Sequence, residues 1–163
     1  MKKKNAKNTK DIYSYRPLII ILATILIASL AIYYPSPIDF MHNFMGVFFV
    51  IFALFKFFDL DGFVQGFAMY DLVTKKFYRY GYAYPFIELL LGVLYLSGTA
   101  LMITDVATLA LMCLSAAGVT KALGSGMNVR CACLGTTLNV PLSTVSIIEN
   151  GGMGLMALIS LLS

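Results

Sequence analysis

Residues 17–34 read PLIIILATILIASLAIYY, a stretch without a single charged side chain. About 20 apolar residues in an α-helix cover the roughly 30 Å hydrocarbon core of a bilayer, so the stretch predicts a transmembrane helix. A basic leader, residues 1–16, comes before it, which is also typical of a signal peptide. The apolar stretch is long for a signal peptide, however, and no small-residue cleavage site follows it. We therefore expect this helix to be retained.

The rest of the chain has the same apolar character. Its 163 residues are 60% hydrophobic and only 12% charged, whereas a soluble domain carries about a quarter charged residues. This composition predicts an all-α fold class: a polytopic membrane helical bundle of about five transmembrane helices, in one transmembrane domain at residues 17–163. Thr104 and Asp105 are expected to form a minimal turn between two of the later helices. The four helices expected after the first lie at 41–58, 82–103, 106–123 and 143–163.

Two polar segments interrupt the apolar helices. Residues 59–80 are too charged to cross a bilayer but retain many aromatic side chains, which is typical of a short interfacial helical segment. Polar side chains there, such as Tyr70 and Asp71, are expected on a solvated face or over the loop that follows the fourth helix. That loop, residues 124–142, contains Cys131 and Cys133.

The basic residues predict the orientation in the membrane. If five helices alternate in direction, the leader, the segment 56–81 and the segment 121–142 share one side. They carry six, four and two basic residues, which accounts for all twelve in the chain. Short loops rich in Lys and Arg stay in the cytoplasm, so we expect the N-terminus and the Cys131/Cys133 loop to be cytoplasmic. Confinement of the +4 net charge to these segments also argues against a nucleic-acid partner.

Cys131 and Cys133 are separated only by Ala132. A disulfide closing so small a ring would be strained, and strained disulfides exchange readily. The pair therefore suits thiol–disulfide exchange with a protein partner, and the neighbouring Arg130 favours the thiolate. The pair equally suits binding and transfer of a soft ion such as Cu(I) or Hg(II), which thiolates select. A third reading is a structural membrane subunit in which the two thiols are incidental.

Charged residues at membrane depth are further candidates for a site. Glu88 is expected inside a transmembrane helix, where it is a candidate proton relay, an ion ligand or a partner of Lys56. The alternative for Glu88, and the favoured reading for Glu149, is a structural hydrogen bond between helices. Lys56 is expected to extend its ammonium to the membrane surface.

Soft ligands cluster at the other side of the membrane. Met41, His42 and Met45 would suit Cu(I), although an interfacial histidine beside packing methionines is the commoner arrangement. Cys113 is expected as a buried small apolar side chain. The sequence shows no phosphate-binding glycine loop, metalloprotease helix or Ser/His/Asp set, which argues against a hydrolase or nucleotide enzyme.

Four short motifs stand out along the chain. They are Phe55-Lys56-Phe57-Phe58-Asp59, Phe67-Ala68-Met69-Tyr70-Asp71, Pro85-Phe86-Ile87-Glu88-Leu89 and Cys131-Ala132-Cys133-Leu134-Gly135. Together they resemble the motifs of the MauE/DoxX-like family of redox-associated membrane proteins, whose thiol motif is Cys-Gly-Cys-Phe-Gly. The match covers about residues 42 to 163. The resemblance implies a protein of the bacterial inner membrane that supports disulfide formation in, or maturation of, a partner protein, as the methylamine-utilisation member is thought to do.

Two departures from this family bear on function. Ala132 replaces a glycine, and the helix at 17–34 precedes the family core, which would reverse the side on which later loops emerge. A cytoplasmic thiol pair cannot directly oxidise an exported partner. The start Tyr15-Arg16-Pro17-Leu18 is similar to relatives that carry a heavy-metal-binding domain before the first helix. The expected partners are therefore the lipid bilayer and a redox or metal-delivering protein, with oligomerisation left open.

Overall fold

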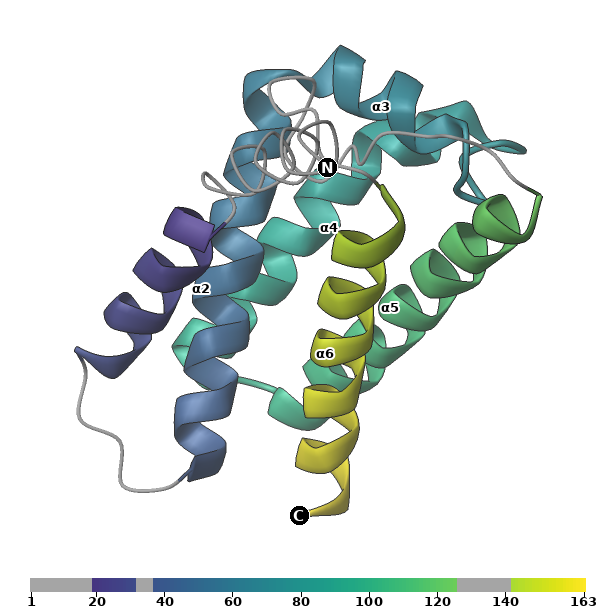
Figure 1. Cartoon of the computed structure of the whole chain (residues 1–163). Helices are drawn as coiled ribbons and strands as arrows, with labels where there is room; N and C mark the ends of the chain where they lie inside the picture. The colour runs from purple at the N-terminus through teal and green to yellow at the C-terminus, as the bar shows by residue number, and fades with distance from the viewer. Residues whose placement is uncertain (1–18, 32–36, 126–141) are drawn as a thin grey trace, which may run out of the picture.

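The computed structural model describes residues 19–31, 37–125 and 142–163, and every regular element in these ranges is a helix (Figure 1). The predicted all-α fold class is therefore confirmed. By length and composition, α2 and α5 can cross a membrane, and the apolar helix Ile19–Leu30 is shorter. The number of crossings stays a prediction. The helices are Ile19–Leu30, α2 (Pro37–Phe58), α3 (Leu60–Ala68), α4 (Tyr78–Ser97), α5 (Leu101–Gly124) and α6 (Leu142–Leu162).

Several helix boundaries differ from the expected ones: α4 begins at Tyr78 and α5 at Leu101, each a few residues early, and two further differences have clear physical reasons. α2 begins four residues early, at Pro37, because the fixed φ of proline suits the first turn of a helix. The expected turn at Thr104 and Asp105 is wrong, since both residues are buried within α5. α4 ends instead at Gly98, which has a left-handed φ of 66°, a common way to end a helix.

The segment between α2 and α4 consists of one short helix and a series of turns. Asp59 starts α3 by accepting a hydrogen bond from the backbone N–H of Gly62 at 3.1 Å. After α3, the carboxylate of Asp71 accepts hydrogen bonds from the backbone N–H and the hydroxyl of Thr74 at 2.7 and 2.8 Å. Tyr70 and Asp71 are buried, so the expectation of a solvated face is wrong for these two residues. The carboxylate of Asp71 stabilises the turn.

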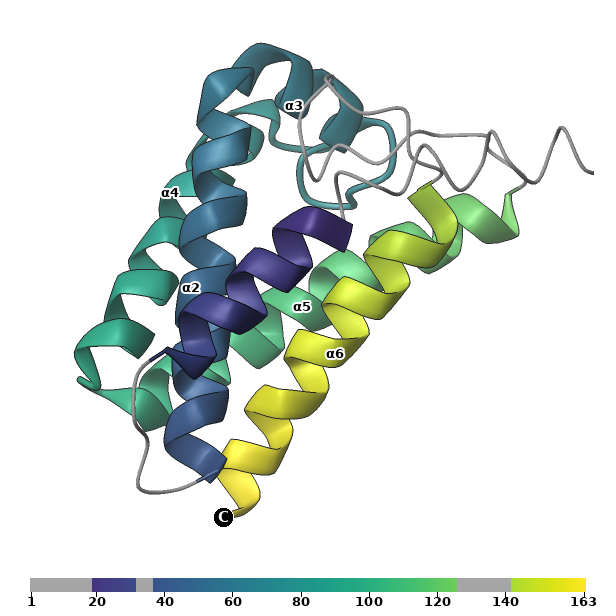
Figure 2. The same ribbon diagram turned by 60° about the vertical axis from the view of Figure 1, so that its left-hand side comes forward.

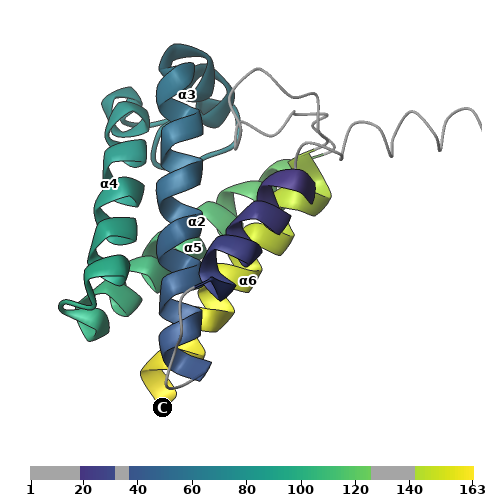
Figure 3. The same ribbon diagram turned by 90° about the vertical axis from the view of Figure 1, so that its left-hand side faces the viewer.

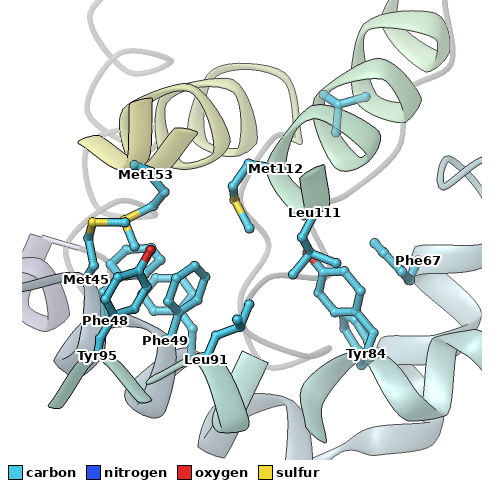
Figure 4. Close-up of a cluster of buried hydrophobic side chains, with 14 of the residues drawn as sticks. Met45, Phe48, Phe49, Phe67, Tyr84, Leu91, Tyr95, Leu111, Met112 and Met153 are labelled. Atoms are coloured by element: carbon cyan, nitrogen blue, oxygen red, sulfur yellow. The ribbon is translucent and has the colours of Figure 1, made fainter. Parts of the chain in front are cut away.

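The long helices pack as two antiparallel pairs, α2 with α4 and α5 with α6, as Figures 2 and 3 show from two further sides. Between the pairs lies an aromatic and sulfur-rich core, part of which is drawn in Figure 4. Gly46 and Gly92 bring α2 and α4 close together. A Cβ on Gly92 would lie 3.0 Å from the carbonyl oxygen of Gly46, so the contact requires residues without a side chain.

Cys113 lies on the outer face of α5. The buried residues of this helix recur at spacings of three and four, as one helical face requires. Cys113 falls between them and is exposed, so the expectation that it is buried is wrong. The buried set is Thr104, Asp105, Thr108, Leu111, Met112, Ser115, Gly118, Val119 and Ala122.

Candidate functional site

A buried ion pair joins α2 to α4. The ammonium of Lys56 donates to Oε2 of Glu88, and both residues are only 4% exposed. The expectation that Lys56 reaches the surface is therefore wrong, and of the alternatives for Glu88 the structure contains the pair with Lys56. The ammonium lies 5.4 Å from the ring centroid of Phe63 and 5.1 Å from that of Tyr84. Cation–π attraction to these rings offsets part of the desolvation of the lysine.

A cavity of about 30 Å³ adjoins this pair. Aromatic side chains from α2, α3 and α4 form much of its wall, and Ser115, Glu149 and Asn150 supply polar groups from α5 and α6. Asn150 donates its side-chain N–H to Oγ of Ser115 at 3.1 Å. Oε1 of Glu149 is buried and has no hydrogen-bond partner among the described residues. We refer to Lys56, Glu88 and Glu149 as the Lys56 cluster.

A second polar cluster lies at the opposite end of the bundle, where α2 and α5 begin and α6 ends. Tyr95 donates to Oδ1 of Asp105 at 2.7 Å, and Ser160 donates to Oδ2 at 2.6 Å. His42 lies with Nε2 2.6 Å from Oγ of Ser160, and its ring stacks on that of Tyr95 with centroids 5.7 Å apart. We call these four residues the His42 cluster, to which each long helix contributes one side chain.

The His42 cluster contains a serine, a histidine and an aspartate, a set that was not expected from the sequence. In a hydrolytic triad the histidine lies between the serine and the carboxylate and removes the serine proton. Here Ser160 donates directly to Asp105, and Nδ1 of His42 has no partner among the described residues. The arrangement is a hydrogen-bond chain that anchors four helices, and it lacks the order that a serine nucleophile needs.

Tyr95, Asp105 and Ser160 were all missed by the sequence reasoning. The signal that points to this cluster is Asp105 itself, because a carboxylate within an apolar helix requires donors from neighbouring helices. A depression of about 270 Å³ lies beside it, lined in part by Ile38, Met102 and Leu161.

The proposed soft ligands on α2 have separate surroundings. Met45 is fully buried in the core, and Figure 4 shows its side chain pointing toward Met153 of α6. His42 directs Nε2 to Ser160 instead. Within the described ranges, no group of three His, Cys, Asp or Glu side chains is placed to hold a metal ion. The metal reading of Met41, His42 and Met45 stays a prediction.

Cys131 and Cys133 lie outside the described residues. The two helices that flank them in sequence, α5 and α6, are antiparallel, so the end of α5 and the start of α6 lie at the same end of the bundle, the end that also carries α3 (Figure 2). Lys56 lies in the last turn of α2 at this end. The Lys56 cluster therefore lies at the end of the bundle where α5 ends and α6 begins.

The helical architecture and the buried ionisable clusters define a helical membrane protein. Residues 15–163 match the family described as methylamine utilisation protein MauE, and the chain belongs to this family. No match was found among curated proteins or among solved structures.

The range of the family match corrects one expectation. The match begins at residue 15 and includes the helix Ile19–Leu30. The idea that this helix is an addition to a family core starting near residue 42 is therefore wrong. The similarity to relatives with a heavy-metal-binding domain stays a prediction, because the match concerns the membrane helices alone.

Proposed function

We propose that this protein is a membrane thiol redox accessory that exchanges disulfides with a partner protein through Cys131 and Cys133. Membership of the MauE family supports an accessory role in the membrane, and its description extends the proposal to methylamine utilisation. The distribution of basic residues supports a multi-pass protein of the bacterial inner membrane with a cytoplasmic N-terminus and thiol loop.

The exchange needs no further oxidant. One cysteine thiolate of the chain attacks a sulfur of the partner's disulfide, and a partner thiolate leaves. The second cysteine then attacks the mixed disulfide, so that the chain carries the Cys131–Cys133 disulfide and the partner carries two thiols. Two electrons pass from the chain to the partner, and the strained small ring makes the reverse reaction easy.

The observation that carries this proposal is that basic side chains gather at the end of the bundle where α5 ends and α6 begins, and the sequence between these two helices contains two thiols one residue apart. Lys75, Lys76 and Arg79 lie between α3 and the first turn of α4, Lys121 lies in the last turn of α5, and all four are exposed. Positive charge lowers the cost of forming a thiolate. This end of the bundle therefore favours the reactive form of a nearby thiol.

Thiol titration of the full-length chain in lipid nanodiscs tests the proposal. In a Cys113→Ser background, incubation with glutathione disulfide should remove two titratable thiols, and dithiothreitol should restore them. Cys133→Ser should instead trap a stable mixed disulfide with glutathione on Cys131. The matched control for this trapped variant is the Cys113→Ser chain with both cysteines of the pair present: it lacks the same exposed thiol, and its mixed disulfide should resolve to the Cys131–Cys133 disulfide and release glutathione. If the two thiols never disappear reversibly, the redox role is excluded.

A second candidate function is transfer of a soft metal ion through the same thiols. The observation that favours it is that Met45 and Met153 both belong to the buried core of the bundle, since thioethers select Cu(I). Competition with a Cu(I) chelator should then show stoichiometric binding that Cys131→Ser and Cys133→Ser each abolish. If neither exchange nor metal binding depends on the thiols, a structural subunit is the remaining reading.

A further inference from the structure

We propose that the cavity beside Lys56 and Glu88 binds water and one proton, and that Glu149 is the group that takes the proton. This site lies in the membrane bundle and does not depend on the thiol chemistry. The inference combines three observations: the size of the cavity, a buried oxygen without a partner, and the balance of charges around it.

The size of the cavity fits water. A buried water needs about 10–15 Å³ and two to four polar partners, and this cavity measures about 30 Å³. Lys56, Glu88, Ser115, Glu149 and Asn150 all contribute to its wall. The space is too small for an organic cofactor and large enough for one or two waters.

The unpartnered oxygen shows where such water would bind. Oε1 of Glu149 is buried and makes no hydrogen bond to a described residue, although buried polar atoms in proteins nearly always have a partner. The neighbouring amide of Asn150 is directed to Ser115. A water in the cavity would supply the missing hydrogen bond and connect Glu149 with the ion pair.

If Glu149 is ionised, the groups around the cavity carry one negative charge that has no positive partner. The ammonium of Lys56 is already paired with Glu88, so an ionised Glu149 would leave an excess negative charge at membrane depth, which is costly. The other polar groups in the wall are neutral: Tyr70 after α3, Tyr84 of α4, Ser115 of α5 and Asn150 of α6. A metal cation would meet the ammonium of Lys56 at close range. A proton on Glu149 restores neutrality without that repulsion.

Infrared spectroscopy of the full-length chain in lipid nanodiscs tests this site. At neutral pH the carbonyl stretch of a protonated carboxylic acid should be present. It should shift when the protein is labelled with ¹³C-glutamate, because Glu88 and Glu149 are the only glutamates in the chain. Glu149→Gln should remove this band. The matched control is Asp61→Asn, which alters an exposed carboxylate that accepts a hydrogen bond from the hydroxyl of Tyr82 and should leave the band in place.

Two results would overturn the proposal: absence of a glutamate band in the wild-type protein, or its persistence in Glu149→Gln. The isotope measurement uses the wild-type chain, so the test holds even if the variant does not fold. Cys131→Ser/Cys133→Ser should keep the band. Failure of thiol exchange and failure of the proton site are therefore distinguishable.

Discussion

The two polar clusters of this bundle both compensate buried carboxylates among apolar helices, but they do so with different partners. The Lys56 cluster places opposite charges in contact and leaves a carboxylate oxygen facing a small cavity. The His42 cluster gives both oxygens of its single carboxylate a hydroxyl donor, from Tyr95 and Ser160. The first arrangement is electrostatically incomplete and suits a site that binds or moves a proton. In the second arrangement the polar atoms have hydrogen-bond partners, except Nδ1 of His42 among the described residues, and this suits an anchor between helices.

This difference predicts unequal sensitivity to substitution. Removing one partner of a buried ion pair leaves an uncompensated charge, which costs about 3–5 kcal/mol. Hydrogen bonds between helices in a membrane contribute less, about 0.6 kcal/mol on average and about 1.7 kcal/mol at most. The Lys56 cluster should therefore dominate the effect of polar substitutions on stability.

The largest effect is expected for Glu88→Leu. The substitution leaves the ammonium of Lys56 buried among aromatic rings without a counter-charge, so we expect the free energy of unfolding to fall by about 3–5 kcal/mol. Denaturant-induced unfolding in mixed micelles would measure the change. The double variant Lys56→Met/Glu88→Leu should recover most of the loss, because an apolar pair replaces the ion pair. Equal instability of the single and double variants would show that the two charges are not coupled.

An intermediate effect is expected for Gly92→Ala, which acts on both clusters. The new Cβ would lie 3.0 Å from the carbonyl oxygen of Gly46 and 3.0 Å from the backbone nitrogen of Val50. α2 and α4 would have to separate, at a cost of about 1–3 kcal/mol, and both clusters bridge these helices. The same unfolding measurement applies. Gly151→Ala is the control, since a Cβ there meets nothing within 4 Å; if it destabilises as much as Gly92→Ala, the close approach of α2 and α4 is not the cause.

The smallest effect is expected for Tyr95→Phe. This change removes one donor to Asp105 and keeps the ring that stacks on His42. Ser160 still donates to the carboxylate, so we expect a loss of about 0.6–1.7 kcal/mol in the same unfolding assay. A loss as large as that of Glu88→Leu would contradict the contrast between the clusters.

The Lys56 cluster could be predicted in part because charged residues stand out in apolar segments. The sequence indicates both Lys56 and Glu88 as candidates, and their pairing is one of the alternatives it leaves open for Glu88. The sequence did not indicate the depth of Lys56, because a lysine near a helix end usually extends to the surface. The aromatic rings that surround its ammonium come from α3 and α4, and their arrangement depends on tertiary packing.

Only His42 of the second cluster was a candidate from the sequence, because two of the other members are ordinary residues of membrane helices and the third, Asp105, was assigned to a turn. Tyr95 and Ser160 carry no charge, and Asp105 follows a threonine in a pair that resembles a turn. The true turn has its own signal in Gly98, which lies between Ser97 and Thr99. Recognising Gly98 as the end of α4 would have placed Asp105 inside α5 and shown that its carboxylate needed partners.

Because Cys113 is exposed, a label attached to it can report how deeply α5 lies in the bilayer. The residue lies about halfway along α5, on its exposed face. When serine replaces Cys131 and Cys133, this sulfur is the last thiol in the chain. A nitroxide attached there would sit near the bilayer midplane if α5 crosses the membrane, where oxygen relaxes its electron spin far more than a water-soluble nickel complex does. The ratio of the two relaxation rates would then measure how deeply α5 is immersed.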